Sequence, residues 1–93
     1  MIQGHNDEVI GLHFDEVNKI IYSASADGWI NMIDAQRCVI INKLELASQI
    51  TRMHADVFNR RLFVALAEGN IEIFEYENAR MKYLHSISPP ALG

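Results

Sequence analysis

Cysteine, proline and long apolar runs are all scarce in this chain of 93 residues. Cys38 is the only cysteine, so no internal disulfide can form, and an intracellular, cytoplasmic setting is expected. No apolar run approaches the roughly 18 residues of a membrane helix, and the N-terminus lacks the pattern of a secretory signal. Both prolines, Pro89 and Pro90, lie in the stretch 88–93, which is therefore expected to be a tail beyond the last strand.

Positive charge is scarce too, because 8 Lys and Arg stand against 12 Asp and Glu, giving a formal net charge of −4. A surface that follows phosphates needs an excess of cations, so the charge argues against a nucleic acid as partner. Helical periodicity is missing, since no stretch of about a dozen residues has apolar side chains at i, i+3 and i+4. The composition, with 49% hydrophobic and 22% charged residues, is that of an ordinary globular protein.

The chain does contain an internal repeat. A shift of 41 positions aligns residues 9–34 with residues 50–75 without a gap. Turn positions agree as well, because Asp27-Gly28 aligns with Glu68-Gly69. A period of this length is typical of architectures in which one supersecondary unit recurs. The identical pairs are His13/His54, Asp15/Asp56, Asn18/Asn59, Ala24/Ala65, Ala26/Ala67, Gly28/Gly69 and Ile30/Ile71.

Each unit reads as four short strands separated by polar turns. An Asp-Gly pair between two alternating apolar runs is a strong hairpin signal, because glycine adopts positive φ without steric cost. The pattern predicts an all-β fold of two four-stranded antiparallel sheets, with a β-sandwich built from hairpins as the alternative. The expected strands span 9–14, 19–25, 29–34, 38–46, 50–55, 61–67, 70–77 and 80–87.

The segments Gly4-His5 and SASADGWINMID (23–34) resemble a WD40 repeat. That family has Gly-His before the first strand and an Asp in the turn between the second and third strands. A Ser or Thr lies four residues before this Asp, and a Trp lies six residues after it. Here His5 lies 22 residues before Asp27 and Ser23 lies four before it, whereas Ile33 occupies the Trp position.

The resemblance implies two WD40-like propeller blades, in residues 1–46 and 47–87, with the second blade the more degenerate. A blade buries both faces of its sheet against neighbours, so two blades alone leave apolar faces bare. The remaining blades are therefore expected in a longer chain or in other copies of this one. A self-assembling unit that closes a ring is one alternative function.

The resemblance also assigns roles to individual residues. His5, Ser23 and Asp27 are implied to form a structural hydrogen-bonded brace, although the same residue types occur in hydrolase triads. The turns at the upper rim of such propellers commonly dock other proteins. A non-catalytic scaffold that binds a protein or peptide there is the expected function. The expected partner-binding residues are Asn6, Asp7, Trp29, Glu68 and Asn70.

Two features of this rim have a second interpretation. Trp29 is an interface residue if it faces a partner, but it is a packing residue if it covers the gap left by Ile33. The acids Asp7, Glu8, Asp27 and Glu68 favour a basic partner, or they form an edge that is merely solvated.

The motif His-x-Asp occurs at His13–Asp15 and again at His54–Asp56. A metal-dependent enzyme that uses His13 and His54 is the catalytic alternative to the scaffold function. Repetition alone also explains the pair, because duplicated strands end on the same residues. Since a metal site needs three or four converging ligands, no metal, no cofactor and no catalytic residue is expected.

Overall fold

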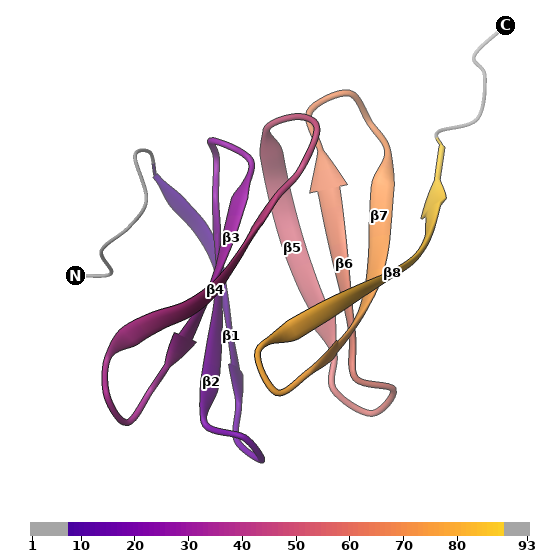
Figure 1. The fold of residues 1–93 in the computed structure, drawn as a ribbon. Coiled ribbons are helices and arrows are strands. Elements are labelled where there is room, and N and C mark those ends of the chain that lie inside the picture. The colour runs from indigo at the N-terminus through magenta and orange to yellow at the C-terminus, as the bar shows by residue number, and fades with distance from the viewer. Residues whose placement is uncertain (1–7, 89–93) are drawn as a thin grey trace, which may run out of the picture.

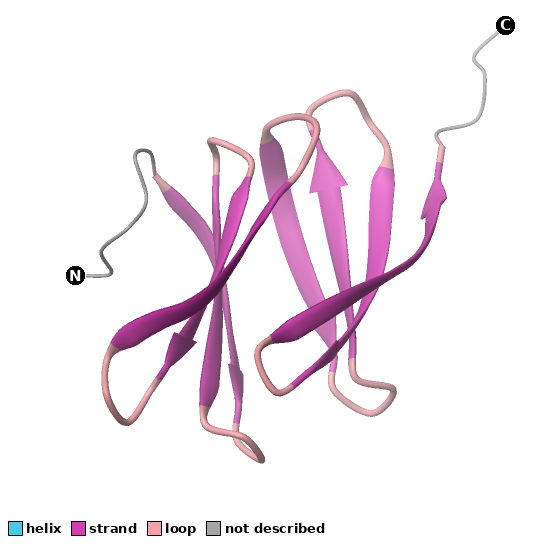
Figure 2. Cartoon of the chain, in the orientation of Figure 1, coloured by secondary structure: helices cyan, strands magenta, loops and turns pink. Residues whose placement is uncertain are grey.

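The computed structural model describes residues 8–88, and these form two antiparallel sheets with no helix among them (Figures 1 and 2). No segment of residues 8–88 is therefore a helix able to cross a membrane. Every expected strand is confirmed to within one residue at each end. The strands are β1 (Val9–Asp15), β2 (Ile20–Ser25), β3 (Trp29–Asp34), β4 (Val39–Glu45), β5 (Ile50–Asp56), β6 (Arg61–Leu66), β7 (Ile71–Glu77) and β8 (Arg80–Ile87).

Each sheet is a simple meander. Its strands are ordered as in the sequence, β1-β2-β3-β4 in one sheet and β5-β6-β7-β8 in the other. We call the first sheet blade 1 and the second blade 2. The first strands, β1 and β5, lie next to each other, while β4 and β8 are the outer strands (Figure 1). Such four-stranded meanders, set face to face, are the units from which a propeller is built.

The repeat seen in the sequence recurs in the backbone. Gly28 and Gly69 both have positive φ, and so do Lys19 and Arg60, at 58° and 55°. The register of the first strand pair shifts at Val9/Gly11 in blade 1 and at Ile50/Arg52 in blade 2. The correspondence ends at the last hairpin, which turns over residues 78–79 in blade 2 but over residues 35–38 in blade 1.

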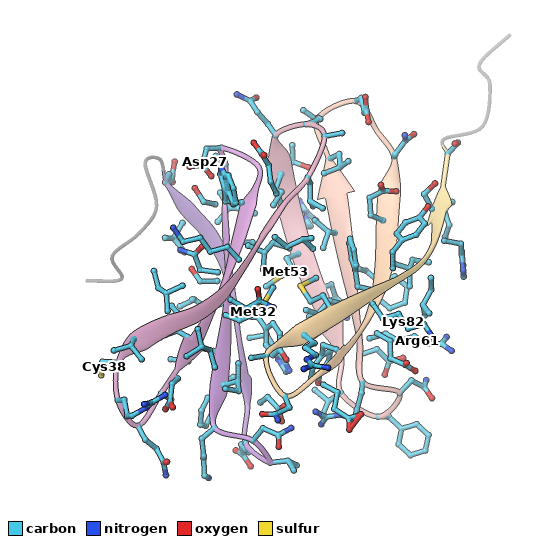
Figure 3. The ribbon with its side chains drawn as sticks, viewed as in Figure 1. Asp27, Met32, Cys38, Met53, Arg61 and Lys82 are labelled. Carbon is cyan, nitrogen blue, oxygen red and sulfur yellow. The ribbon has the colours of Figure 1, made fainter. Side chains whose placement is uncertain are left out.

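The core lies between the two blades, where Met32 and Met53 approach each other (Figure 3). Because side chains alternate along a strand, only one face of each sheet contributes to it. Gly11 lets the innermost strands come close, since a Cβ there would lie 3.2 Å from Cβ of Met53. The buried core residues are Ile20, Tyr22, Ala24, Ile30, Met32, Ile50, Leu62, Val64, Leu66, Phe74, Tyr76 and Ala79.

Candidate functional site: the rims and the joint between the blades

The hairpin turns gather at two ends of the molecule (Figure 1). We call the upper rim the end formed by turns 26–28 and 67–70 and the connection 46–49. The lower rim is the opposite end, formed by turns 16–19, 35–38, 57–60 and 78–79. Asp27 marks the upper rim and Cys38 the lower rim in Figure 3. Turns from different blades therefore lie side by side at each end, which is how a propeller builds a surface from separate repeats.

The upper turn of blade 1 is held by hydrogen bonds within itself. The Gly28 amide donates to the Ser25 carbonyl oxygen at 3.1 Å. The Asp27 carboxylate then accepts from the Trp29 amide at 3.2 Å. Trp29 opens β3 with its side chain half-buried. The turn thus fixes the backbone from which the tryptophan projects.

The upper turn of blade 2 has the same form. The Gly69 amide donates to the Leu66 carbonyl oxygen at 2.9 Å, and the Asn70 carbonyl oxygen accepts from the Leu66 amide at 2.8 Å. Glu68 is exposed and its Oε1 accepts from Asn70 Nδ2 at 3.4 Å. The structure therefore brings Trp29, Glu68 and Asn70 to one end, while the expected rim residues Asn6 and Asp7 lie outside residues 8–88.

The implied brace is described only in part. Ser23 is completely buried in β2, and Asp27 is half-buried at the turn. Ile33, at the position of the family's tryptophan, is 8% exposed. His5 lies outside the described residues, so the brace stays a prediction.

A second cluster, which we call the blade joint, connects the lower halves of the two blades. Its centre is an ion pair between Asp15, at the end of β1, and Arg60, at the end of the first turn of blade 2. Arg60 Nη2 lies 2.7 Å from Asp15 Oδ2, and the Asp15 side chain is only 2% exposed. Asn18 and the Val17 amide also donate to the Asp15 carboxylate. The carboxylate is thus fully surrounded by donors, as a buried charge requires.

Aromatic rings surround this ion pair. The Arg60 guanidinium carbon lies 4.7 Å from the ring centroid of Tyr76, a cation–π contact. Tyr22 packs edge-on against Tyr76 with centroids 5.1 Å apart. His13 Nε2 lies 2.9 Å from the Tyr76 hydroxyl, so the first strand of blade 1 is hydrogen-bonded to the third strand of blade 2.

The last turn of blade 2 is also tied to blade 1. The Ala79 amide donates to the Tyr22 hydroxyl at 3.1 Å. Asn42 Nδ2, from the outer strand of blade 1, donates to the Ala79 carbonyl oxygen at 2.9 Å. Ala79 itself has a φ of 66°, typical of a tight turn. The two blades are therefore joined by polar contacts at several strands, in addition to the apolar core.

The electrostatics of the joint follow from burial. Burial is the main cause that lowers the pKa of His13, outweighing the Asp15 charge that raises it. Burial also raises the pKa of Tyr22 to about 12. Burial opposes ionisation of Asp15, but the hydrogen bonds from Arg60 and Asn18 outweigh it, so the pKa of this carboxyl is lowered. Near neutral pH the joint contains a neutral imidazole beside a charged ion pair.

A pocket of about 330 Å³ opens at the lower rim, next to the joint. Its edge includes apolar residues of the two first turns, Val17 and Val57, which are 78% and 64% exposed. Phe58, the next residue in the turn of blade 2, is 93% exposed. The sequence analysis missed this surface, although an apolar run in a turn that otherwise takes polar residues was a visible signal. The lining residues are His13, Phe14, Asp15, Glu16, Val17, Val57, Arg60 and Tyr76.

The two His-x-Asp motifs do not form one site. His13 faces blade 2, where Tyr76 holds it. His54 lies on the opposite face of blade 2, because its neighbours Met53 and Ala55 pack on the core. Among residues 8–88 no group of three or more His, Cys, Asp or Glu is arranged to hold a metal ion.

The fold is that of two blades of a WD40-like β-propeller, and comparison with solved structures shows the same. The chain is similar to the β-propeller domain of Cps50 (Swd1) from Myceliophteria thermophila, with a TM-score of 0.73 and 19% identity over 87% of this chain. It is also similar to a chain of the mitotic checkpoint complex, with a TM-score of 0.78 and 16% identity over 91% of this chain. These likenesses replace the β-sandwich alternative.

The chain spans 29% of the first of these proteins and 28% of the second. No family model matches the sequence. No curated protein matches it either.

Proposed function

We propose that this chain is a non-catalytic scaffold of the WD40 type that binds a protein or peptide at its upper rim. One observation carries the proposal: turns from two separate blades present Trp29, Glu68 and Asn70 at the same end. A half-buried tryptophan beside exposed polar groups is a composition typical of interface hot spots. Asn6 and Asp7 belong to the proposed surface by sequence.

The chemistry of the partner follows from charge. Asp27 and Glu68 are both acidic, and the whole chain carries a formal charge of −4. A basic protein or peptide is therefore the proposed partner, because complementary charge speeds encounter and rejects wrong partners. The single, exposed Cys38 supports an intracellular setting as part of this proposal.

The proposal is tested with two substitutions at the rim and one control. Fluorescently labelled Lys- and Arg-rich peptides are titrated with the protein, and anisotropy reports binding. Trp29→Ala and Glu68→Lys should each weaken binding about tenfold or more, as interface hot spots do. Phe58→Ser, at the opposite end, is the control and should leave it unchanged.

Two results would contradict the proposal. One is that all three variants bind the peptides as tightly as the natural protein does. The other is loss of the β signal in circular dichroism on Trp29→Ala, because Trp29 would then be a packing residue. The Glu68→Lys variant keeps the test informative in that second case, since Glu68 is exposed and its side chain supports no core contact.

A self-assembling unit that closes a propeller ring is the second candidate function. It is favoured by exposed apolar side chains on the outward faces of the two blades: Leu12 is 58% exposed on blade 1 and Ile87 is 49% exposed on blade 2. Light scattering after size exclusion tests it. A sharp trimer or tetramer, three or four times 10.6 kDa, supports this function, and a monomer contradicts it.

A further inference from the structure

The lower rim carries apolar side chains that no contact within residues 8–88 explains. Val17, Val57 and Phe58 are 78%, 64% and 93% exposed, although all three lie in tight turns. Turns of this kind are ordinarily built from Gly, Asn, Asp and Ser. Glycine adopts the backbone angles that a turn needs, and the polar side chains hydrogen-bond to the turn backbone. Exposed apolar residues clustered at adjacent turns mark an interaction surface.

Two of these residues, Val17 and Val57, line a depression, and Phe58 follows Val57 in the same turn. The pocket of about 330 Å³ lies between the two first turns, with Val17 on one side and Val57 on the other. A volume of this size accommodates one or two large side chains of a partner. Its walls are held by the blade joint, in which Asp15 and Arg60 are paired at 2.7 Å. The depression is therefore preformed rather than opened by the partner.

The charge of the lining selects the partner. Arg60 is neutralised by Asp15, and burial keeps the His13 imidazole neutral near pH 7. Glu16 is exposed and takes part in neither of the two ion pairs found in residues 8–88. The lining thus carries one unbalanced negative charge beside an apolar edge. A cation placed next to an apolar side chain complements both features.

We propose that the lower rim is a second docking surface, which takes a peptide segment carrying a large apolar side chain next to a Lys or Arg. The apolar side chain enters the pocket between Val17 and Val57, and Phe58, exposed in the same turn as Val57, offers the segment a further apolar contact outside the pocket. The neighbouring cation of the segment pairs with Glu16. This surface is independent of the upper rim, because the two lie at opposite ends of the molecule (Figure 1).

The test uses three labelled peptides that differ in one feature each. The first has Leu or Phe flanked by Lys, the second replaces Lys by Glu, and the third replaces the apolar residue by Ser. Anisotropy should show binding of the first peptide and at least tenfold weaker binding of the other two. Added salt should weaken binding of the first peptide, since the charge pair is exposed.

Variants of the protein locate the site. Phe58→Ser and Val57→Ser should each weaken the first peptide several-fold, and Glu16→Lys should weaken it further. All three side chains are exposed, so folding is retained, and circular dichroism confirms it. Trp29→Ala and Glu68→Lys are matched controls at the upper rim, and they should leave this binding unchanged. The upper-rim proposal and this one therefore fail separately.

Three outcomes overturn the proposal. Equal binding of the Lys and Glu peptides removes the charge argument. Binding that is unaffected by Phe58→Ser and Val57→Ser removes the site. A chain whose mass rises with concentration, and falls to the monomer on Phe58→Ser, means that a second copy occupies the pocket instead of a basic peptide.

Discussion

The charge of Asp15 is paired with one cation, Arg60, within residues 8–88. The Asp15 side chain is 2% exposed and its carboxylate receives the guanidinium of Arg60, which comes from the other blade. Removing Arg60 leaves a buried carboxylate without its cation, which is costlier than removing both groups. Ion pairs at the surface contribute little to the free energy of unfolding by comparison. The pair Asp34–Arg37, in which the Arg37 side chain is 70% exposed, is of that weaker kind.

The first prediction follows from this contrast. Arg60→Met should lower the free energy of unfolding by about 2–3 kcal/mol, because it isolates the Asp15 charge. The double variant Asp15→Asn/Arg60→Met should recover part of this loss, since no buried charge remains. Arg37→Met, the surface control, should change stability by less than about 0.5 kcal/mol. Urea unfolding measures all three, and a double variant no more stable than Arg60→Met would contradict the argument.

Sequence reasoning reached the upper rim but not the joint or the pocket at the lower rim, and the reason is physical. Turn and strand patterns are local, so the positions of Trp29, Glu68 and Asn70 in or next to the two hairpin turns were predicted correctly. The contact between Asp15 and Arg60 spans 45 residues and depends on how two sheets face each other, which no local pattern encodes. Tyr76 was harder still, because its aligned position in the first unit is Ala35. The repeat could not point to it.

At the scale of the element, the hairpin turn of blade 1 depends on one glycine. Gly28 has a φ of 95°, where any other residue is strained. A Cβ at this position would also lie 2.9 Å from the carbonyl oxygen of Ser48, in the connection between the blades. This contact is with backbone, which cannot move aside as a flexible side chain can. The turn and the connection are therefore packed against each other.

The second prediction compares two glycines. Gly28→Ala should destabilise the protein by more than about 2 kcal/mol, because φ strain and the carbonyl clash add. Gly69 has a φ of 101° in the corresponding turn, so Gly69→Ala measures the loss of stability that comes from backbone strain in such a turn. Thermal unfolding followed by circular dichroism gives both values. A smaller loss for Gly28→Ala than for Gly69→Ala would contradict the packing against Ser48.

Strand positions were the most predictable part of the fold, since hydrophobic alternation and Gly punctuation specify them residue by residue. The last hairpin shows the limit. The expected strands there were right, yet blade 2 pairs Tyr76 with Met81 and Glu77 with Arg80 across a shorter turn. This extension delivers Tyr76 and Ala79 to blade 1. The register of a hairpin is set by its turn, and neither turn has an Asn-Gly or Asp-Gly signal.

At the scale of the whole molecule, the joint makes stability depend on pH. His13 faces Tyr22 and Tyr76, with Asp15 and Arg60 beside it, and burial lowers its pKa. The unfolded chain therefore binds a proton at His13 more readily than the folded protein does. Stability from this residue is complete above the ordinary pKa of 6.5 and is lost as the pH falls below it.

The third prediction is a flatter pH profile without this imidazole. The midpoint temperature of thermal unfolding should decrease when the pH is lowered from about 7.5 to about 5.5 in the natural protein. It should decrease less in His13→Gln. The pKa of Asp15 is lowered, so its contribution is lost only in more acidic solution. His54→Gln is the matched control, at the corresponding position of blade 2, and it should keep the natural slope. Parallel profiles for the natural protein and His13→Gln would contradict the assignment.

Trp29 is the only tryptophan of the chain, and it lies at one end of the molecule. The aromatic rings of the joint are those of two tyrosines and a histidine, and the exposed aromatic rings at the lower rim, Phe14 and Phe58, are phenylalanines. Ultraviolet light near 295 nm excites tryptophan alone, so the emission of this protein reports on its upper end and on nothing else. A ligand that binds at the upper end should therefore change this emission, whereas one that binds at the lower end should leave it unchanged, without any label on the protein.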